Sequence, residues 1–383
     1  MCVFFWSIDQ PGFDLVIASN RDEFLARGTV PAVWHRFGPI PDDETSPPSV
    51  ATGPTDERPI LSARDEQSGG TWLGITRDGS FATLTNFTEP PPPPPPGPHG
   101  FQSRGNLVRD WLLRASDTDT DTDTATTARP SSAAQDRQAI VDYLGDGVGS
   151  RLDQFPGFNL VVGSSRPDRT SIGYTTNRTP TGHLAAHRQP DFFSSPSSHH
   201  DVGDPVVVTG NTLTHARASC PAVVARGLSN STLEHPWSKV DQGVELFDKA
   251  MQRYTGSAGQ GSGPGRHQAA EDALIEDLFD LLWTSSDPPP QRKEDLRRSL
   301  LISPLKVDGL GWYATRTSTV VLIRKAPAAA AADADGVAGR RRATFVERDV
   351  FELDQDAGQP VRRCGGTGST RQAGQRRYSW TLD

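Results

Sequence analysis

The sequence predicts a layered α+β fold, in which strands come first, two helices follow and further strands complete the chain. Apolar, β-branched segments bounded by turn residues dominate both ends, and segments with leucines at helical spacing lie between them. This order favours an α+β architecture over alternating βαβ units. Only 34% of the 383 residues are hydrophobic, alongside 36 glycines and 32 prolines. That composition predicts one compact domain with poorly packed insertions.

Two hairpins are predicted in the first part of the chain. Residues 3–8 and 14–19 are apolar runs separated by turn residues, which favours an opening hairpin. Residues 71–75 and 80–85 are separated by Arg77-Asp78-Gly79. An Asp-Gly pair supplies the positive φ angles of a tight hairpin turn, so we expect a second hairpin there.

One short helix and two longer ones are expected after these hairpins. The segment 103–116 begins with Ser103, a suitable N-cap, and places Leu107, Trp111 and Leu112 on one face. Residues 241–253 and 269–283 repeat apolar residues at helical spacing. Further strands are expected at 157–162, 205–209, 317–324, 343–348 and 378–382.

Low-complexity segments interrupt these elements. They include a polyproline run, an Asp-Thr repeat, a Ser/His-rich loop, a Gly/Ser run and an alanine tract. Such compositions do not bury enough apolar surface to pack. We therefore expect a single domain over residues 1–383, with disordered insertions near 88–100, 115–136, 188–204, 255–268, 325–342 and 355–376.

Charge and cysteine content restrict the partners and the compartment. The formal net charge of −8, with only the isolated cluster at 340–342 as a basic run, argues against nucleic-acid binding. Three cysteines make no disulfide framework, which is typical of a reducing compartment. The apolar start is broken by Asp9, Asp14 and Arg21, so we expect neither a secretory signal nor a transmembrane segment. The expected location is cytoplasmic.

Cys2 admits two interpretations. In the first it is a small buried hydrophobe of the opening strand. In the second, removal of Met1 makes Cys2 the N-terminus and gives it an amine beside its thiol. Because that amine has a reference pKa near neutrality, it can accept the thiol proton and leave a thiolate that attacks an amide carbonyl. Such a site also needs an oxyanion donor and a group that holds the amine.

Residues suited to these roles stand where predicted strands end. Arg21 and Asp22 follow the second strand, Asn86 follows the fourth, Asn230 lies in a later loop and Arg316 precedes the strand at 317. Functional side chains are common at such positions. Charged and amide residues are also ordinary turn formers, so composition alone leaves both interpretations open.

A set of short motifs resembles a known family. The set comprises Met1-Cys2, NRDEF at 20–24, GGTWLGI at 69–75, LTNF at 84–87, SRG at 103–105, GFNLVV at 157–162, LSNSTLEHPWSKV at 228–240 and TRTSTVVLI at 315–323. These motifs, in this order, resemble the NRDE family, also called the Transport and Golgi organisation protein 2 family. The low-complexity segments fall between the motifs, as insertions would.

The resemblance implies a fold and a set of site residues. The family resembles N-terminal-nucleophile hydrolases, so the implied fold is an αββα sandwich of two antiparallel sheets. By motif order, Cys2 is the implied nucleophile, Arg21 and Asp22 its orienting pair, Asn86 and Asn230 the oxyanion and amine partners, and Arg316 a charge near the thiolate. Asn211 competes with Asn230 for one of these roles.

The resemblance also implies two classes of function. One is a role in Golgi organisation and protein secretion, together with trafficking of haem or lipid. The protein would then associate with the Golgi or mitochondria. It would require no cofactor, and haem or a lipid-like small molecule would be its cargo. The other is an N-terminal cysteine amidohydrolase acting on a small amide or acyl-amide. Cys220, which precedes a proline, is a candidate haem ligand or an ordinary loop cysteine.

The remaining motifs favour structural interpretations. His199-His200 lacks partners at zinc-ligand spacing, so no metal site is expected. The Gly-rich run at 259–265 lacks the lysine of a phosphate-binding loop and is interpreted as a linker. Trp72, Trp237 and Trp312 are expected to pack the core or line its pocket, and Trp237 is a candidate cover for such a pocket.

Overall fold

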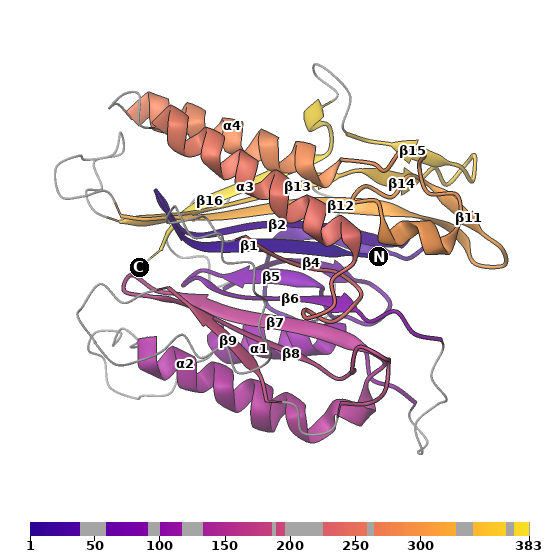
Figure 1. Cartoon of the computed structure of the whole chain (residues 1–383), viewed down its shortest axis with the longest axis horizontal. Coiled ribbons are helices and arrows are strands. Elements are labelled where there is room, and N and C mark those ends of the chain that lie inside the picture. The colour runs from indigo at the N-terminus through magenta and orange to yellow at the C-terminus, as the bar shows by residue number, and fades with distance from the viewer. Residues whose placement is uncertain are drawn as a thin grey trace.

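The computed structural model places two antiparallel sheets face to face between two layers of helices (Figure 1). It describes residues 1–38, 59–90, 100–116, 133–185, 189–195, 225–258, 264–326, 340–364 and 371–382. Within these ranges each of the two large sheets has seven strands. The predicted α+β class and the αββα layer order are confirmed.

The first sheet joins the two ends of the chain. Its order is β10-β1-β2-β12-β13-β16, with β11 paired to β12. The strands are β1 (Val3–Gln10), β2 (Phe13–Phe24), β10 (Arg226–Leu228), β11 (Leu305–Val307), β12 (Gly311–Arg324), β13 (Arg341–Asp349) and β16 (Gln375–Leu382). The pairing of β2 with β12 shifts register between Thr315 and Thr317, and it places Thr315 opposite Asp22. This pairing builds one side of the candidate site.

The second sheet follows the chain in simple order from β3 to β9. Its strands are β3 (Thr29–His35), β4 (Ile60–Asp65), β5 (Leu73–Thr76), β6 (Ser80–Asn86), β7 (Phe158–Ser165), β8 (Thr170–Thr176) and β9 (Asp191–Ser194). The turn between β5 and β6 contains Gly79 at φ 92°, the backbone conformation that its Asp-Gly pair predicts.

Helices cover the outer faces of both sheets. Helices α3 (Ser238–Ala258) and α4 (Pro264–Leu282) cover the first sheet, while α1 (Gly105–Ser116) and α2 (Ala133–Asp142) cover the second (Figure 1). Short helical turns lie at Tyr143–Val148, Gly149–Gln154 and Lys293–Arg297. A separate hairpin pairs β14 (Phe351–Leu353) with β15 (Pro360–Arg362).

The alternation of side chains along β1 explains the layers. Val3 and Phe5 belong to the apolar cluster under α3 and α4, whereas Phe4 and Trp6 belong to the cluster between the two sheets. A third cluster joins the second sheet to α1 and α2. Because successive residues of a strand face opposite sides, a strand buried on both faces is apolar throughout. The continuous run at 3–6 is such a strand.

Most predicted elements are confirmed, and several bounds change. Both hairpins, the helix after Ser103 and the two long helices are present. β3, β4 and β8 were not anticipated. Ordered elements extend into segments expected to be insertions, since β9 lies within 188–204, β15 lies within 355–376, and α3 continues to Ala258. The strand expected at 205–209 lies outside the described residues.

Candidate active site

The N-terminal amine is buried against Asp22. Met1 is 5% exposed, and its amine lies 3.0 Å from Asp22 Oδ2 and also donates to the hydroxyl of Tyr313. The other carboxylate oxygen, Oδ1, accepts a hydrogen bond from Thr315 at 2.6 Å. Burial lowers the pKa of the amine, and the Asp22 charge opposes that change. Asp22 therefore holds the Met1 amine, and its predicted role beside a Cys2 nucleophile stays a prediction.

Cys2 lies directly beside this pair. Its Sγ is half-buried and lies 3.8 Å from the backbone carbonyl oxygen of Asp22. The Cys2 carbonyl oxygen accepts a hydrogen bond from Ser229 Oγ at 2.7 Å. Burial raises the pKa of the Cys2 thiol, while the N-terminal ammonium opposes that rise. With Met1 present, the thiol is therefore a weaker nucleophile at neutral pH than an exposed cysteine.

Arg21 and Asp22 have different partners, because adjacent residues of a strand point to opposite faces. The Arg21 guanidinium stacks on the ring of Trp72, 3.9 Å from its centroid, and donates to Thr29 Oγ1 at 2.9 Å. Burial lowers the pKa of Arg21, and the charges of Glu23 and Cys2 oppose that change. Arg21 thus contributes positive charge to the region of the thiol, and Trp72 supports it.

Arg316 is engaged with the turn that follows β2. Its Nη1 donates to the carbonyl oxygens of Leu25, at 3.4 Å, and of Arg27. Burial lowers its pKa, against the opposing charges of Asp349 and Glu23. These contacts place Arg316 at the β2–β3 turn, and its role near the thiolate stays a prediction.

The two predicted asparagines occupy different environments. Asn86 is half-buried at the end of β6, opposite Phe158. Asn230 is 7% exposed, and its backbone oxygen accepts a hydrogen bond from the Thr88 amide at 2.8 Å. The side-chain oxygen of Asn230 is buried without a hydrogen-bond partner among the described residues. Buried amide oxygens are normally paired. Asn230 therefore has unused hydrogen-bonding capacity close to the N-terminus.

Asn159 holds the Asn230 loop in place. From β7 of the second sheet, its Nδ2 donates to the carbonyl oxygens of Ser229 at 3.2 Å and Ser231 at 2.9 Å, and also to Thr85 Oγ1. Its Oδ1 accepts a hydrogen bond from the Tyr174 hydroxyl at 2.9 Å. Sequence reasoning did not single out Asn159. A lone amide within an otherwise apolar strand was the available signal.

Lys239 and Tyr313 complete the surroundings of the N-terminus, and neither was anticipated. The Lys239 ammonium is fully buried and donates to the Met1 carbonyl oxygen at 2.7 Å. The Tyr313 hydroxyl donates to the Asp22 carbonyl oxygen at 3.0 Å. Both lie within or beside motifs of the resemblance, but nothing in their spacing marked them as neighbours of Cys2.

The three tryptophans have packing roles. Trp72 supports Arg21, and Trp312 packs against the cluster around Leu25. Trp237 packs against the small cluster of Met1, Leu296 and Ile302. This position agrees with core packing, and the interpretation of Trp237 as the cover of a pocket stays a prediction.

Several other candidates cannot be placed. Asn211, Cys220, His199 and His200 lie outside the described residues. Among the residues that are described, no group of three or more His, Cys, Asp or Glu side chains is arranged to hold a metal ion. In the same part of the chain, no helix is long and apolar enough to cross a membrane.

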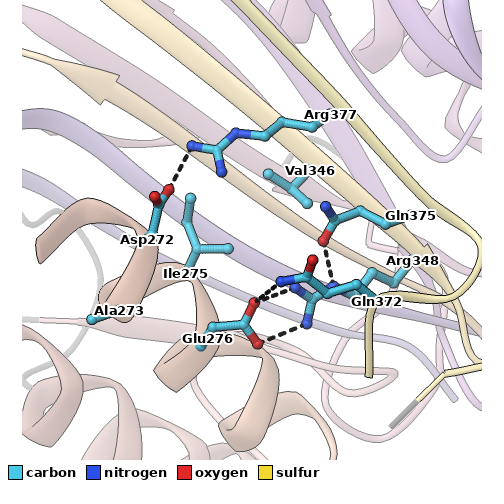
Figure 2. A pocket seen from close by; sticks show the side chains of 9 residues that line it. All are labelled: Asp272, Ala273, Ile275, Glu276, Val346, Arg348, Gln372, Gln375 and Arg377. Atoms are coloured by element: carbon cyan, nitrogen blue, oxygen red, sulfur yellow. Dashed lines mark hydrogen bonds and ion pairs between the residues drawn. The ribbon is translucent and has the colours of Figure 1, made fainter. Parts of the chain in front are cut away.

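A pocket of about 390 Å³ lies between α4 and the edge of the first sheet, and its lining contains none of the predicted site residues (Figure 2). Its charges are paired with one another: Arg348 contacts Glu276, and Arg377 lies 2.8 Å from Asp272. Gln375 accepts a hydrogen bond from Arg348, and Gln372 donates one to Glu276. We assign this pocket a structural role, because its charged side chains are paired with one another.

Comparisons with known proteins agree over most of the chain. The model of a family described as Transport and Golgi organisation 2 matches residues 1–349. A Transport and Golgi organization protein 2 homolog of Bos taurus is 27% identical over 366 residues, which cover 92% of this chain and 95% of that protein. The corresponding homolog of Homo sapiens is 26% identical over 372 residues, with the same coverage of 92% and 95%.

Among solved structures, a mutant conjugated bile acid hydrolase from Clostridium perfringens is similar, with a TM-score of 0.37 and 7% sequence identity. The similarity covers 100% of this chain and 98% of that one.

Proposed function

Because this chain belongs to the Transport and Golgi organisation 2 family, we propose that it acts in Golgi organisation and protein secretion. The observation that carries this proposal is the family match over residues 1–349. The family resemblance further suggests haem or a lipid-like molecule as the cargo, and association with the Golgi or mitochondria as the setting.

A rescue experiment tests the cellular role. In cells from which the Homo sapiens relative has been removed, we expect this chain to restore secretion of a reporter protein and the compact Golgi shape, if either is impaired. Leu310→Ala is the matched control for expression, because Leu310 is 63% exposed and outside the site. The proposal would be contradicted if the wild-type chain were expressed as well as Leu310→Ala but restored neither reporter secretion nor Golgi shape.

Binding of haem is tested on the purified protein. Titration with haem should give a saturable shift of the Soret band at one equivalent, because a protein environment changes the ligands and polarity around the iron. If no saturable shift is seen, haem is excluded as the cargo. The lipid-like cargo is tested separately, by binding of a fluorescent fatty acyl probe.

The geometry at the N-terminus favours a second candidate, an amidohydrolase that works through Cys2. The specific observation is the buried amine held 3.0 Å from Asp22, with the Cys2 thiol next to it in the chain. In the structure this amine belongs to Met1. Excision of Met1 transfers the terminal amine to the Cys2 nitrogen, so that base and nucleophile belong to one residue.

The chemistry of this candidate is acyl transfer. The Cys2 amine takes the thiol proton, and Sγ forms a bond to the carbonyl carbon of a small amide. The carbon–nitrogen bond then breaks, and the leaving amine takes the proton from the Cys2 ammonium. Water hydrolyses the resulting thioester and releases the acid. The Asn230 side-chain amide is the donor we propose for the oxyanion, because the family resemblance implies such a role and the adjacent Ser229 hydrogen-bonds the Cys2 carbonyl oxygen.

Intact mass and thiol labelling test this candidate first. Loss of Met1 together with fast alkylation of Cys2 at pH 7 is the expected result. Cys364 serves as the internal comparison, because burial raises the pKa of its thiol to about 12. Cys2→Ser should then abolish turnover of a panel of small amides without unfolding the protein. Turnover that survives Cys2→Ser would rule out the amidohydrolase.

A further inference from the structure

Lys239 occupies a position that neither its helix nor the core explains. It is the second residue of α3, its side chain is fully buried, and its ammonium lies 5.7 Å from the centroid of the Trp237 ring. A cation in the first turn of a helix opposes the helix dipole. Burial of an ammonium away from water is also costly. We therefore infer that Lys239 acts on the group to which it donates a hydrogen bond.

That group is the peptide bond between Met1 and Cys2. The Lys239 ammonium donates to the Met1 carbonyl oxygen at 2.7 Å. This oxygen and the Cys2 nitrogen belong to the same planar peptide unit and are about 2.2 Å apart. The sum of these two distances is the largest possible separation between the Lys239 nitrogen and the Cys2 nitrogen. The two nitrogens therefore lie within about 5 Å of each other.

The backbone of Cys2 is fixed independently of Met1. Val3 pairs with Asn20 of β2, and Phe4 pairs with Leu228 of β10. Ser229 holds the Cys2 carbonyl oxygen at 2.7 Å. Excision of Met1 therefore leaves the Cys2 nitrogen beside Lys239, now as a free amine. Lys239 loses its carbonyl acceptor at the same step.

We propose that Lys239 is a positioning residue that keeps the free Cys2 amine neutral, and so able to accept a proton, after Met1 has been removed. The proposal rests on the amidohydrolase candidate for its functional meaning. A protonated amine beside a second ammonium is disfavoured by repulsion between like charges, which is strong in a buried site. The neutral amine is the form that takes the thiol proton.

Several charged and titratable groups surround the N-terminal amine. In the chain that retains Met1, the charges of Asp22, from β2, and of the ionised Cys2 thiol favour the protonated amine, whereas the charge of Lys239, from α3, opposes it. Tyr313 approaches from β12, and burial raises its pKa well above the usual value, so that it stays neutral. Burial lowers the pKa of Lys239 to about 8, against the charges of Asp22 and Cys2, so it still carries its proton at neutral pH.

The test is a titration of the Cys2 amine in the full chain without Met1. The chain has three cysteines, so selective ¹³C labelling of cysteine gives three sets of signals, and the signal lost in Cys2→Ser identifies Cys2. We expect Lys239→Met to raise the midpoint of the amine titration by about one pH unit or more, because the repelling charge is gone. Lys249→Met, an exposed lysine of the same helix, should leave the midpoint unchanged.

An unchanged or lowered midpoint in Lys239→Met would overturn the proposal. If that variant does not fold, Lys239→Gln, which also removes the charge, decides: a midpoint that is unchanged or lowered in this second variant overturns the proposal. The titration needs no substrate. Failure to hydrolyse any amide would count against the amidohydrolase candidate but would not change the measured titration of the Cys2 amine. Failure of the proposed function and failure of the Lys239 proposal are therefore distinguishable.

Discussion

Asp22 is the residue that organises the candidate site. One carboxylate oxygen meets the N-terminal amine, the other accepts from Thr315, and its carbonyl oxygen contacts both Cys2 and Tyr313. These contacts come from two distant parts of the sequence, residues 1–2 and residues 313–315. A single aspartate in the NRDEF motif therefore links the first strand to β12.

Removal of the Asp22 charge tests this role. In the protein that retains Met1, we expect Asp22→Asn to lower the free energy of unfolding by about 2–4 kcal/mol, because a buried ammonium loses its carboxylate. Asp9→Asn is the matched control, since Asp9 pairs with Lys325 at the surface with 42% of its side chain exposed. That change should cost less than about 1 kcal/mol in a denaturant titration. Equal costs for the two variants would refute the assigned role of Asp22.

At the scale of secondary-structure elements, the site is held by contacts between the two sheets. Asn159 in β7 reaches the loop after β10, and that loop reaches Cys2 through Ser229. A strand of the second sheet thus sets the position of a loop of the first. This link couples the site to the packing of the sheets.

Truncation of Asn159 should break this link. We expect Asn159→Ala to reduce the free energy of unfolding by about 2–3 kcal/mol, because it removes the buried hydrogen bonds that join Asn159 to the Tyr174 hydroxyl and to the carbonyl oxygens of Ser229 and Ser231. Asn86→Ala, at the half-buried end of a neighbouring strand, should change it by less than about 1 kcal/mol. Denaturant unfolding of both variants checks the prediction, which fails if Asn159→Ala is as stable as the wild type.

Helix α4 packs against the first sheet through ion pairs as well as through apolar residues. Burial alone would raise the pKa of Glu276, but hydrogen bonds from Arg348 and Arg371 lower it to about 2. A carboxyl group with a lowered pKa stabilises the fold above its unfolded value, and this contribution disappears as the pH falls toward the folded value. The expected window of loss thus runs from about pH 4.5 down to about 2.

Glu276→Gln tests that window. At neutral pH the variant should be less stable by about 1–2 kcal/mol, after allowance for solvent screening of a partly exposed group. The difference should shrink as the pH falls from 4.5 toward 2. Glu352→Gln, which removes a more exposed pair with Arg363, is the control and should show little pH dependence. Thermal unfolding at a series of pH values measures both. A difference independent of pH would exclude the proposed linkage.

For the molecule as a whole, stability depends on the apolar layer between the sheets. That layer combines residues from both sheets, including Phe4, Leu15, Leu73, Phe81 and Phe345. Because each sheet is also covered by helices on its other face, central strands such as β1 are buried on both faces. The layer is therefore the part of the core in which a cavity should be most costly.

Phe81→Ala measures that cost. Phe81 is 2% exposed, and we expect the change to lower the free energy of unfolding by about 3–5 kcal/mol through lost burial and a remaining cavity. Leu310→Ala, at a position that is 63% exposed, should change it by less than about 0.5 kcal/mol. A cost below about 1 kcal/mol for Phe81→Ala would mean that the two sheets do not share a packed layer.

The sequence was informative where structure is local. The hairpin turn at Gly79 and the helices with spaced leucines follow from short-range rules, and they are present as expected. β3 was missed because Pro31 interrupts its pattern, and β8 because its residues, TSIGYTT, are mostly polar. Local patterns thus identify elements but not every strand of a sheet.

The site was only partly predictable, for a related reason. Asp22 stands in a recognisable motif, whereas Lys239 lies 238 residues from the Met1 carbonyl it binds, and Tyr313 lies 291 residues from Asp22. Contacts across such separations depend on sheet order, which a single sequence does not encode in any short spacing. Family resemblance supplied Cys2, Arg21 and Asp22, while the surrounding cation and hydroxyl required the fold.

The strand order also has a consequence for the timing of protein synthesis. β2 is completed by β12, and Asn20 meets Ser318, which is 298 residues further along the chain. At a ribosomal rate of about 5–20 residues per second, the first hairpin waits about 15–60 s for this partner. During that interval an aminopeptidase on the ribosome can reach Met1. Once β12 has paired, the amine is enclosed by Asp22 and Tyr313, so we expect any removal of Met1 to precede that pairing.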